Sequence, residues 1–353
     1  MELIRGLHTL RAHHRECVAT IGNFDGVHRG HQAILEQLKT RARALNLPVT
    51  VVIFEPQPRE YFAGDQAPPR LTRMKEKLRL LKAYGADRVL CLPFNQKLRE
   101  LSADDFIERV LVDGLGVRHL VVGDDFRFGC DRAGNFELLK EKGARHGFDV
   151  EHTHTFMLDD ERVSSTRVRT LLASGNFRQA AHQLGRPYVF MGRVVKDRQL
   201  GRTIGIPTAN VPLLPGPMAL RGVYAVQALL DDGAWYPGVA NVGWRPTVGS
   251  SRPVLEVHLL DISPELYGRP MMVMPCARLR GEEKFDGLEA MLAQIKNDIA
   301  LTRRYFNALP FTGGQTGEAS FDDADLTLPV SDRMDTLLAS APLTYASTDH
   351  DDG

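Results

Sequence analysis

The first half of the chain alternates between short apolar runs and longer segments with apolar residues at helical spacing. Apolar runs rich in β-branched residues cover residues 17–21, 49–54, 88–92, 119–123 and 150–156. Segments with apolar residues three and four apart lie between them, at residues 34–45, 71–84, 103–112 and 136–145. Continuous β-branched runs are typical of strands buried on both faces of a sheet. The alternation therefore predicts a parallel α/β sheet covered by helices.

The pattern changes at about residue 185. Short β-type runs, broken by Gly and Pro, follow at residues 189–195, 222–226, 238–242 and 254–259, and helical spacing returns at residues 288–306. This pattern of short runs is typical of an antiparallel β-barrel. We expect one domain at residues 1–183, a β-barrel domain with a terminal helix at residues 184–310, and a tail at residues 311–353.

Charge and composition narrow the class of protein. The 353 residues carry 44 basic and 44 acidic side chains, and zero net charge excludes a general polyanion binder. The tail holds nine acidic residues and one basic residue, which leaves a net charge of +8 on residues 1–310. We expect this tail to be disordered. No apolar run approaches the ~18–20 residues of a membrane span. We expect no signal peptide, because the N-terminus lacks a long apolar stretch and a small-residue cleavage site. The four cysteines form no C-x-x-C pair, so we expect a reducing cytoplasm and no disulfide framework.

A turn between the first apolar run and the first helix contains two histidines three residues apart. The residues of interest are Gly22, Asn23, Phe24, Asp25, His28, Gly30 and His31. Histidines at this spacing share one helix face, and helix N-termini bind phosphate through free N–H groups. The pattern favours a phosphate site at which His28 and His31 stabilise charge. The alternatives are two solvent-facing histidines, or a metal site for which no third ligand lies nearby.

Two further patterns suggest nucleotide chemistry in the second half. A Gly-rich loop contains Gly201, Gly205, Pro207, Thr208 and Asn210 but lacks the Walker spacing. Glycines let backbone amides wrap phosphates, and the oxygens of Thr208 and Asn210 suit Mg²⁺. Glu256 lies in the middle of an apolar run, where its carboxylate could accept a proton from an attacking hydroxyl. The alternatives are an ordinary turn and a solvent-facing glutamate.

These strings resemble one known family. GNFDGVHRGHQ at residues 22–32 is similar to the HxGH signature of nucleotidyltransferases, and to the bacterial FMN adenylyltransferases in particular. Residues 52–58, 122–129 and 162–169 resemble that family's flavin-side strand motif, fourth-strand loop and ISSTxIR box. IPTAN at residues 206–210 resembles the PTAN motif of riboflavin kinases. Over residues 15–308 the chain resembles the bifunctional bacterial riboflavin kinases/FAD synthetases.

The resemblance implies a fold and two reactions. The fold would be an α/β Rossmann-like nucleotidyltransferase domain with a parallel sheet, followed by an antiparallel β-barrel riboflavin kinase domain with a terminal helix. The kinase would convert riboflavin to FMN with ATP, and the transferase would adenylylate FMN to FAD and release pyrophosphate. ATP is then a co-substrate used with Mg²⁺, and FMN and FAD are products rather than prosthetic groups.

The resemblance also implies roles for single residues. His28, His31 and Glu256 would be catalytic. ATP and its phosphates would be bound by Gly22, Asn23, Phe24, Asp25, Gly30, Arg162, Ser165, Thr166, Arg169, Gly201, Gly205, Pro207, Thr208 and Asn210, of which Thr208 and Asn210 would hold the metal. The flavin would contact Phe54, Pro56, Pro58, Asp125 and Phe128. The chain departs from the family at Lys196-Asp197 and Trp244, and at Asp125, where the family often has Asn.

Other function classes stay open from the sequence. One is a transferase for another substrate, with the barrel as a regulatory domain, against which the PTAN loop and Glu256 argue. A second is a flavin or nucleotide sensor without turnover. A third is a class I aminoacyl-tRNA synthetase, which shares the HxGH signature, but this chain is short and lacks a large basic excess. We expect no nucleic-acid or membrane partner, and association into a weak homo-oligomer stays open.

Overall fold

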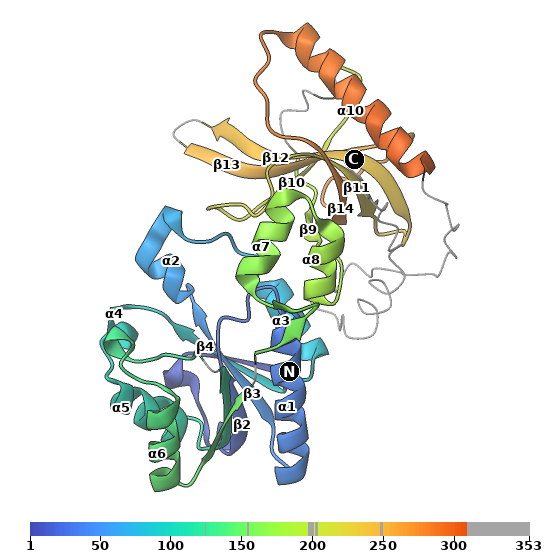
Figure 1. Ribbon diagram of the computed structural model, residues 1–353. Helices are drawn as coiled ribbons and strands as arrows, with labels where there is room; N and C mark the ends of the chain where they lie inside the picture. Colours follow the sequence, from blue (N-terminus) through green and yellow to red (C-terminus); the bar gives the residue numbers. More distant parts are fainter. Residues whose placement is uncertain (124, 154, 197–200, 202–203, 248–249, 309–353) are drawn as a thin grey trace. The chain divides into compact units, whose positions relative to one another are not determined.

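The computed structural model describes residues 1–353 except residues 124, 154, 197–200, 202–203, 248–249 and 309–353. The expected acidic tail and Asp197 therefore lie outside the described residues. The chain forms two compact units, Met1–Arg167 and Val168–Gly353 (Figure 1). The change of sequence pattern predicts a division after residue 183, whereas the contacts divide the chain at Arg167 because the helices that follow pack with the second unit. The limits of the domains stay a prediction.

The first unit is built on a parallel sheet of six strands. Their order is β1-β4-β3-β2-β5-β6, and each pairing is parallel. The strands are β1 Glu2–Arg5, β2 Cys17–Ile21, β3 Val49–Glu55, β4 Arg88–Pro93, β5 Val117–Gly123 and β6 Asp149–Thr153. The predicted parallel sheet is confirmed, and β1 is the strand that the apolar runs did not indicate.

Helices cover both faces of this sheet, with α1 and α6 on opposite faces (Figure 1). They are α1 Arg29–Leu45, α2 Pro58–Ala63, α3 Met74–Ala83, α4 Gln96–Arg99, α5 Ala103–Phe106 with a π-helical turn at Ile107–Val112, and α6 Phe136–His146. A hairpin of β7 Met157–Leu158 and β8 Glu161–Arg162 follows β6. Helix α1 packs on β2, β3 and β5, because its buried residues recur at helical spacing.

The strand order sets where a ligand can bind. The chain runs outward from β2 through β3 to β4 and then returns to place β5 on the other side of β2. In open α/β sheets, ligands bind beyond the carboxyl ends of the strands at such a switch point. The turn that contains Asp25 leaves the end of β2, and the loop that contains Asp125 leaves the end of β5. Both candidate segments therefore leave the sheet at its switch point.

The second unit is an antiparallel sheet that curls into a nearly closed barrel. Its strand order is β10-β13-β12-β11-β14-β9, and a bridge between Val195 and Asn210 links the two edges. Its elements are α7 Ser165–Ser174, which begins in the first unit, α8 Phe177–Leu184, β9 Phe190–Arg193, β10 Ala209–Pro212, β11 Gly222–Leu229, β12 Trp235–Thr247, β13 Ser250–Leu259, β14 Pro270–Arg280 and α10 Leu288–Ala308. The predicted barrel and terminal helix are confirmed.

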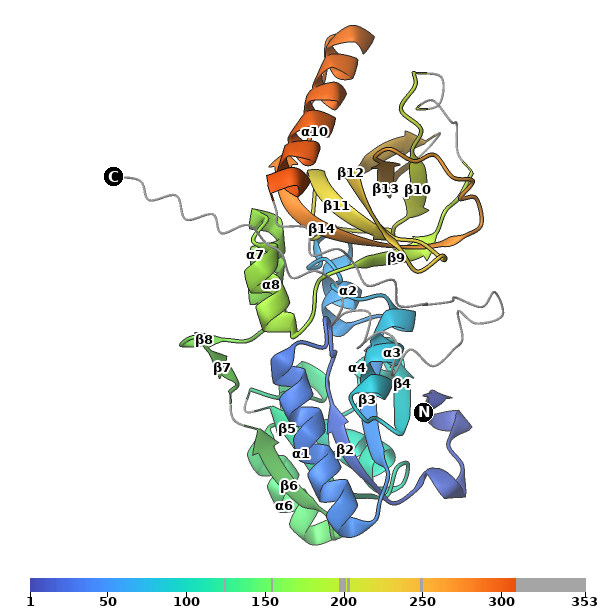
Figure 2. The ribbon, with the colours of Figure 1, turned by 90° about the vertical axis from the view of Figure 1, so that its right-hand side faces the viewer.

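Helix α10 is fixed to the barrel by a buried ion pair. It packs on β11, β12 and β14 (Figure 2). The guanidinium of Arg280 donates to both carboxylate oxygens of Asp298 at 2.9–3.1 Å, and the amide of Gln294 donates to the same carboxylate at 2.9 Å. A buried carboxylate is tolerated when such donors satisfy it. The barrel and its terminal helix therefore form one packed unit.

Two sequence expectations concern the surroundings of the protein. No described helix is both long and apolar enough to span a membrane. The four cysteines are free. Burial raises the pKa of the Cys17 thiol to about 11 and that of the Cys276 thiol to about 12.

Replacement of a buried residue of α1 tests the packing of the first unit. Leu38→Ala should lower the free energy of unfolding by about 2–5 kcal/mol, because it leaves a cavity where the side chain is completely buried. Leu45→Ala, on the same helix but 46% exposed, should change it by about 0.5 kcal/mol or less. Urea unfolding followed by circular dichroism measures both, and equal losses would contradict the orientation of α1.

Candidate active sites

The turn after β2 has an unfavourable backbone conformation. Phe24 and Val27 have φ angles of 47° and 41°, and Gly26 has a φ of 82°. The left-handed region is costly for a bulky side chain and above all for a β-branched one. Because the turn does not hold this shape by itself, the surrounding contacts must fix it.

The side chain of Asp25 provides several of those contacts. Its buried carboxylate accepts hydrogen bonds from the N–H of Leu71 at 3.1 Å and from the N–H and hydroxyl of Thr72 at 3.2 Å. The same hydroxyl accepts from the N–H of Gly26 at 3.1 Å, and the Ser165 hydroxyl donates to the Asp25 carbonyl at 2.8 Å. The structure thus gives Asp25, which was expected to bind ATP, a place in the framework of the turn.

The two histidines lie face to face at the start of α1. Their ring centres are 3.7 Å apart with an interplanar angle of 18°, and the Phe24 ring lies 4.7 Å from His31. His28 is the N-cap, and its Nδ1 accepts from the N–H of His31 at 3.4 Å. The neutral His28 ring then carries its proton on Nε2. The structure therefore brings the predicted pair together.

Gly30 permits this arrangement. A Cβ at this position would lie 3.2 Å from Nδ1 of His28 and 3.6 Å from the carbonyl oxygen of Val163. The first of these distances is tighter than ordinary van der Waals contact. A side chain at this position would push against the His28 ring, so the glycine serves the packing of the histidine pair.

The start of α7 and the hairpin before it contribute polar groups. The Ser164 hydroxyl accepts from the N–H of Arg167 at 3.1 Å and so caps the helix. Arg162 of β8 donates to the Asp125 carboxylate at 3.0 Å, and both side chains are exposed. Thr166 follows in α7, and Arg169 belongs to the second unit.

The expected flavin residues fall into two environments. Phe54 lies at the end of β3, where its ring meets Phe94 edge-on at 5.9 Å. The Glu55–Pro56 peptide is cis, and Pro58 is the first residue of α2. These positions follow the carboxyl end of β3, next to β2 in the sheet.

Phe128 lies elsewhere, in the core. Its side chain is only 6% exposed and packs against Phe106 and Phe126, with ring centres 5.5 Å away in each case. Phe128 also pairs with Gly134 through two backbone hydrogen bonds. Most of its surface is therefore engaged in packing.

In the second unit, three polar residues align across neighbouring strands. Glu256 of β13 pairs with Asn210 of β10 on one side and with Asn241 of β12 on the other. Directly paired residues have Cβ atoms about 4.5–5.5 Å apart. The amide of Asn241 donates to Oε2 of Glu256 at 3.4 Å. We call Asn210, Glu256 and Asn241 the polar row.

The Gly-rich loop lies beside this row. Nδ1 of His258 donates to the carbonyl oxygen of Pro207 at 2.9 Å, and the N–H of Ile206 donates to the carbonyl of Gly201 at 2.8 Å. A cavity lined in part by Thr208 and Tyr267 opens next to the loop. His258 thus ties the loop to β13, the strand that carries Glu256.

The side chain of Asn210 indicates whether this loop is suited to bind a metal ion. The residue is 5% exposed, and its Oδ1 is buried without a hydrogen bond from the described residues. Its amide nitrogen donates to the Thr208 carbonyl at 3.4 Å. A buried acceptor without a donor is suited to a hard cation. The donor set therefore fits Mg²⁺.

Three polar residues at these sites were not predicted from the sequence, namely Asn241, His258 and Lys77. Asn241 acquires its place from strand register, which the sequence does not display. His258 lies two residues from Glu256 and therefore on the same strand face, so alternation could have indicated it. Lys77 occupies an apolar position of α3 with Leu80 and Leu81, and a lysine on an apolar helix stripe is a visible signal. At Trp244, where the chain departs from the family, the backbone N–H donates to the Glu282 carboxylate at 3.3 Å, a bond that does not depend on the side chain.

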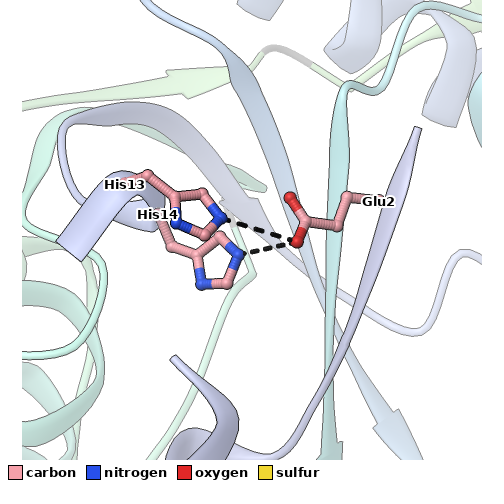
Figure 3. Close-up of side chains that lie close together, drawn as sticks. All are labelled: Glu2, His13 and His14. Atoms are coloured by element: carbon pink, nitrogen blue, oxygen red, sulfur yellow. Dashed lines mark hydrogen bonds and ion pairs between the residues drawn. The ribbon is translucent and has the colours of Figure 1, made fainter. Parts of the chain in front are cut away.

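Glu2, His13 and His14 form a separate cluster in the first unit (Figure 3). Nε2 of His14 lies 2.8 Å from the Glu2 carboxylate, and the N–H of Arg11 donates to its Nδ1 at 2.9 Å. Because Nδ1 accepts, Nε2 carries the proton that is donated to Glu2, and this bond lowers the pKa of Glu2. A metal ion would have to displace that proton, so the cluster is better explained as a hydrogen-bonded tie.

Removal of the Asp25 carboxylate tests the framework of the turn. Asp25→Ala should lower the free energy of unfolding by about 2–5 kcal/mol, because it leaves buried N–H donors without acceptors. The exposed Asp65 provides the matched control, and Asp65→Ala should change stability little. Urea unfolding of both variants measures the difference. An Asp25→Ala protein as stable as the control would show that the carboxylate does not hold the turn.

Each of the two units matches a known protein family. The family profile described as FAD synthetase matches residues 10–167, and the profile described as riboflavin kinase matches residues 184–306. The bifunctional riboflavin kinase/FMN adenylyltransferase of Pseudomonas fluorescens is 54% identical over 304 residues, which cover 86% of this chain and 97% of that protein. The protein of the same name from Escherichia coli K12 is 50% identical over 307 residues, covering 87% and 98%.

A solved structure shares the fold. The chain described as a macrolide-efflux protein from Streptococcus pneumoniae superposes with a TM-score of 0.71 at 29% identity, covering 86% of this chain and 100% of that one. Its name describes the pneumococcal protein, and the likeness to this chain is one of fold. The two matched profiles and the relatives at 50% identity and above, by contrast, extend to both candidate sites. This chain belongs to the family of bifunctional riboflavin kinases/FMN adenylyltransferases.

Proposed function

We propose that each compact unit performs one of the two reactions of the family with the residues singled out above. The second unit phosphorylates riboflavin to FMN with ATP, and the first unit adenylylates FMN to FAD and releases pyrophosphate. The FAD synthetase profile falls within Met1–Arg167 and the riboflavin kinase profile within Val168–Gly353, which supports this division of labour.

The polar row supports the kinase assignment most directly. In this step the terminal hydroxyl oxygen of riboflavin bonds to the γ-phosphorus of ATP. The bond from that phosphorus to the bridging oxygen breaks, and ADP leaves with the electron pair. Glu256 accepts the hydroxyl proton. The aligned register of Asn210, Glu256 and Asn241 carries this proposal, because it pairs a carboxylate with an asparagine on each neighbouring strand.

The loop before the polar row holds the co-substrate. Gly201, Gly205 and Pro207 shape a backbone that can follow a phosphate chain. Thr208 and Asn210 would hold Mg²⁺ through their side-chain oxygens, since the buried Oδ1 of Asn210 fits such a ligand. When bound, the ion neutralises negative charge on the transferred phosphate. His258 keeps the loop in place through the Pro207 carbonyl.

In the first unit, a phosphate oxygen of FMN bonds to the α-phosphorus of ATP. The bond from that phosphorus to the bridging oxygen breaks, and pyrophosphate leaves with the electron pair. The attacking group is already an anion, so no base is required. His28 and His31 donate to the phosphate oxygens as charge develops, and their stacked placement at the start of α1 supports this role.

The remaining residues orient the two substrates. Gly22, Asn23, Phe24, Asp25 and Gly30 shape the turn, whereas Arg162, Ser165, Thr166 and Arg169 add positive charge and hydrogen-bond donors for the phosphates. Phe54, Pro56, Pro58, Asp125 and Phe128 face the flavin in this proposal. Of these, Phe128 has most of its ring packed in the core. We also propose that the protein acts in the cytoplasm without nucleic acid or membrane, as a weak homo-oligomer at most.

Two substitutions should separate the reactions. His31→Ala should slow FMN adenylylation about 10²–10³-fold, the usual effect of losing one electrostatic donor, and spare riboflavin phosphorylation. Glu256→Ala should slow phosphorylation by about 10²–10⁴-fold and spare adenylylation. Chromatography of FMN and FAD, with riboflavin or FMN supplied together with ATP and Mg²⁺, measures both. Loss of both activities in either folded variant would rule out two separate sites. If the parent protein binds flavin but produces neither FMN nor FAD, a sensor function is favoured.

A third substitution tests the metal ligand. Asn210→Leu preserves size but removes Oδ1, and should raise the Mg²⁺ concentration for half-maximal phosphorylation by about tenfold or more, since weak ligand sets bind hard cations poorly. Asn210→Asp retains an oxygen and should change it less. Adenylylation by the same protein is the internal control. An unchanged Mg²⁺ requirement in Asn210→Leu would remove Asn210 from the metal site.

A further inference from the structure

Lys77 is a completely buried lysine of α3, with 0% of its surface exposed. Lysine is almost never fully buried unless it is paired, because the ammonium loses its hydration. Burial lowers the pKa of Lys77, and the negative charge of Asp25 opposes that shift. The ammonium donates to the carbonyl oxygen of Asn23 at 2.7 Å. The negative charges of Glu55 and Glu60 oppose the shift as well, but the hydrogen bond of the ammonium goes to the turn after β2.

That turn is the segment whose backbone needs support. Asn23 immediately precedes Phe24, which has a φ of 47°, and the turn ends at His28. Lys77 fixes the first part of the turn from α3, while the N–H groups of Leu71 and Thr72 fix the Asp25 carboxylate. Two neighbouring contacts from residues 71–77 thus hold the turn in its left-handed conformation.

The same segment also reaches the flavin-side motif. The guanidinium of Arg70 donates to the carboxylate of Glu55 at 2.6 and 3.1 Å and to that of Glu60 at 2.5 and 2.6 Å. Glu55 ends β3 directly before Pro56. Residues 70–77 therefore contact both the turn after β2 and the flavin-side motif. Arg70 makes its hydrogen bonds toward the flavin side, whereas Lys77 donates its hydrogen bond to the turn.

We propose that Lys77 is a positioning residue for adenylylation, whose ammonium holds the Asn23 carbonyl so that the turn presents His28 and His31 to the phosphates of ATP. Lys77 acts through the backbone of the turn and contacts no substrate. The inference rests on the proposed function of the first unit. In this proposal Lys77 differs from Arg70, whose hydrogen bonds to Glu55 hold the flavin-side motif.

The test compares Lys77→Met with Lys82→Met, which removes an exposed lysine from the same helix. Both full-length proteins are assayed for adenylylation over a range of ATP and of FMN, and their melting temperatures are measured. For Lys77→Met we expect kcat/KM for ATP to fall about 10–100-fold, KM for FMN to change less than about threefold, and riboflavin phosphorylation to persist. Lys82→Met should match the parent protein in all three.

Lys77→Arg is the second variant, because it retains a charged donor. It should recover at least part of the lost kcat/KM for ATP, and it keeps the proposal testable if Lys77→Met does not fold. A change of less than threefold in kcat/KM for ATP in Lys77→Met would overturn the proposal. So would an equal loss for ATP and FMN together with a lowered melting temperature and no recovery in Lys77→Arg, since that is the signature of a merely structural lysine.

His31→Ala, assayed in parallel, separates this inference from the proposed function. If His31→Ala remains active, the histidine site itself is wrong, and Lys77 has nothing to position. If His31→Ala is impaired while Lys77→Met is not, the site stands and the role of Lys77 alone is overturned.

Discussion

The first unit depends on how a turn with a left-handed backbone is held at the end of β2. Phe24 and Val27 adopt φ angles that bulky residues avoid, so the conformation persists only because other groups determine it. The buried carboxylate of Asp25, within the turn, accepts from the N–H groups of Leu71 and Thr72, and the buried ammonium of Lys77 donates to the turn's backbone from α3. Each charge alone would be costly to bury. Hydrogen bonds to the backbone make both tolerable and at the same time set the direction from which α1 begins.

The second unit holds its polar side chains in position in a different way. There the polar row is set by strand register, since Glu256 lies between Asn210 and Asn241 in three paired strands. A register shift by one residue would turn Glu256 toward the opposite face, and the barrel's pairing prevents that shift. The site of the first unit depends on hydrogen bonds to a turn, whereas that of the second depends on the sheet itself. We therefore expect the histidine site to be more sensitive than the polar row to substitutions of buried polar residues.

Much of the fold could be predicted from the sequence, because β-branched runs and helical spacing are local signals. These signals predict five strands of the parallel sheet. They do not predict the edge strand β1 or the short helix α8, because each is too short to show a clear pattern and is stabilised by packing with distant residues. The histidine pair could be predicted because the two residues are three apart at the start of one helix. Asn241 could not, because its neighbour Glu256 is 15 residues away in the sequence and reaches it only through pairing.

The motif around the histidines contains residues whose side chains hold other parts of the protein. Asp25 lies in the signature, yet its carboxylate and its carbonyl both hold protein groups. Gly30 accommodates the His28 ring, and Phe24 packs against His31. A turn that is unfavourable on its own requires several fixing contacts for each group it presents to a substrate. A signature for such a turn therefore includes residues that hold the turn as well as residues that touch phosphate. The hydrogen bonds seen in the structure distinguish the two kinds of residue.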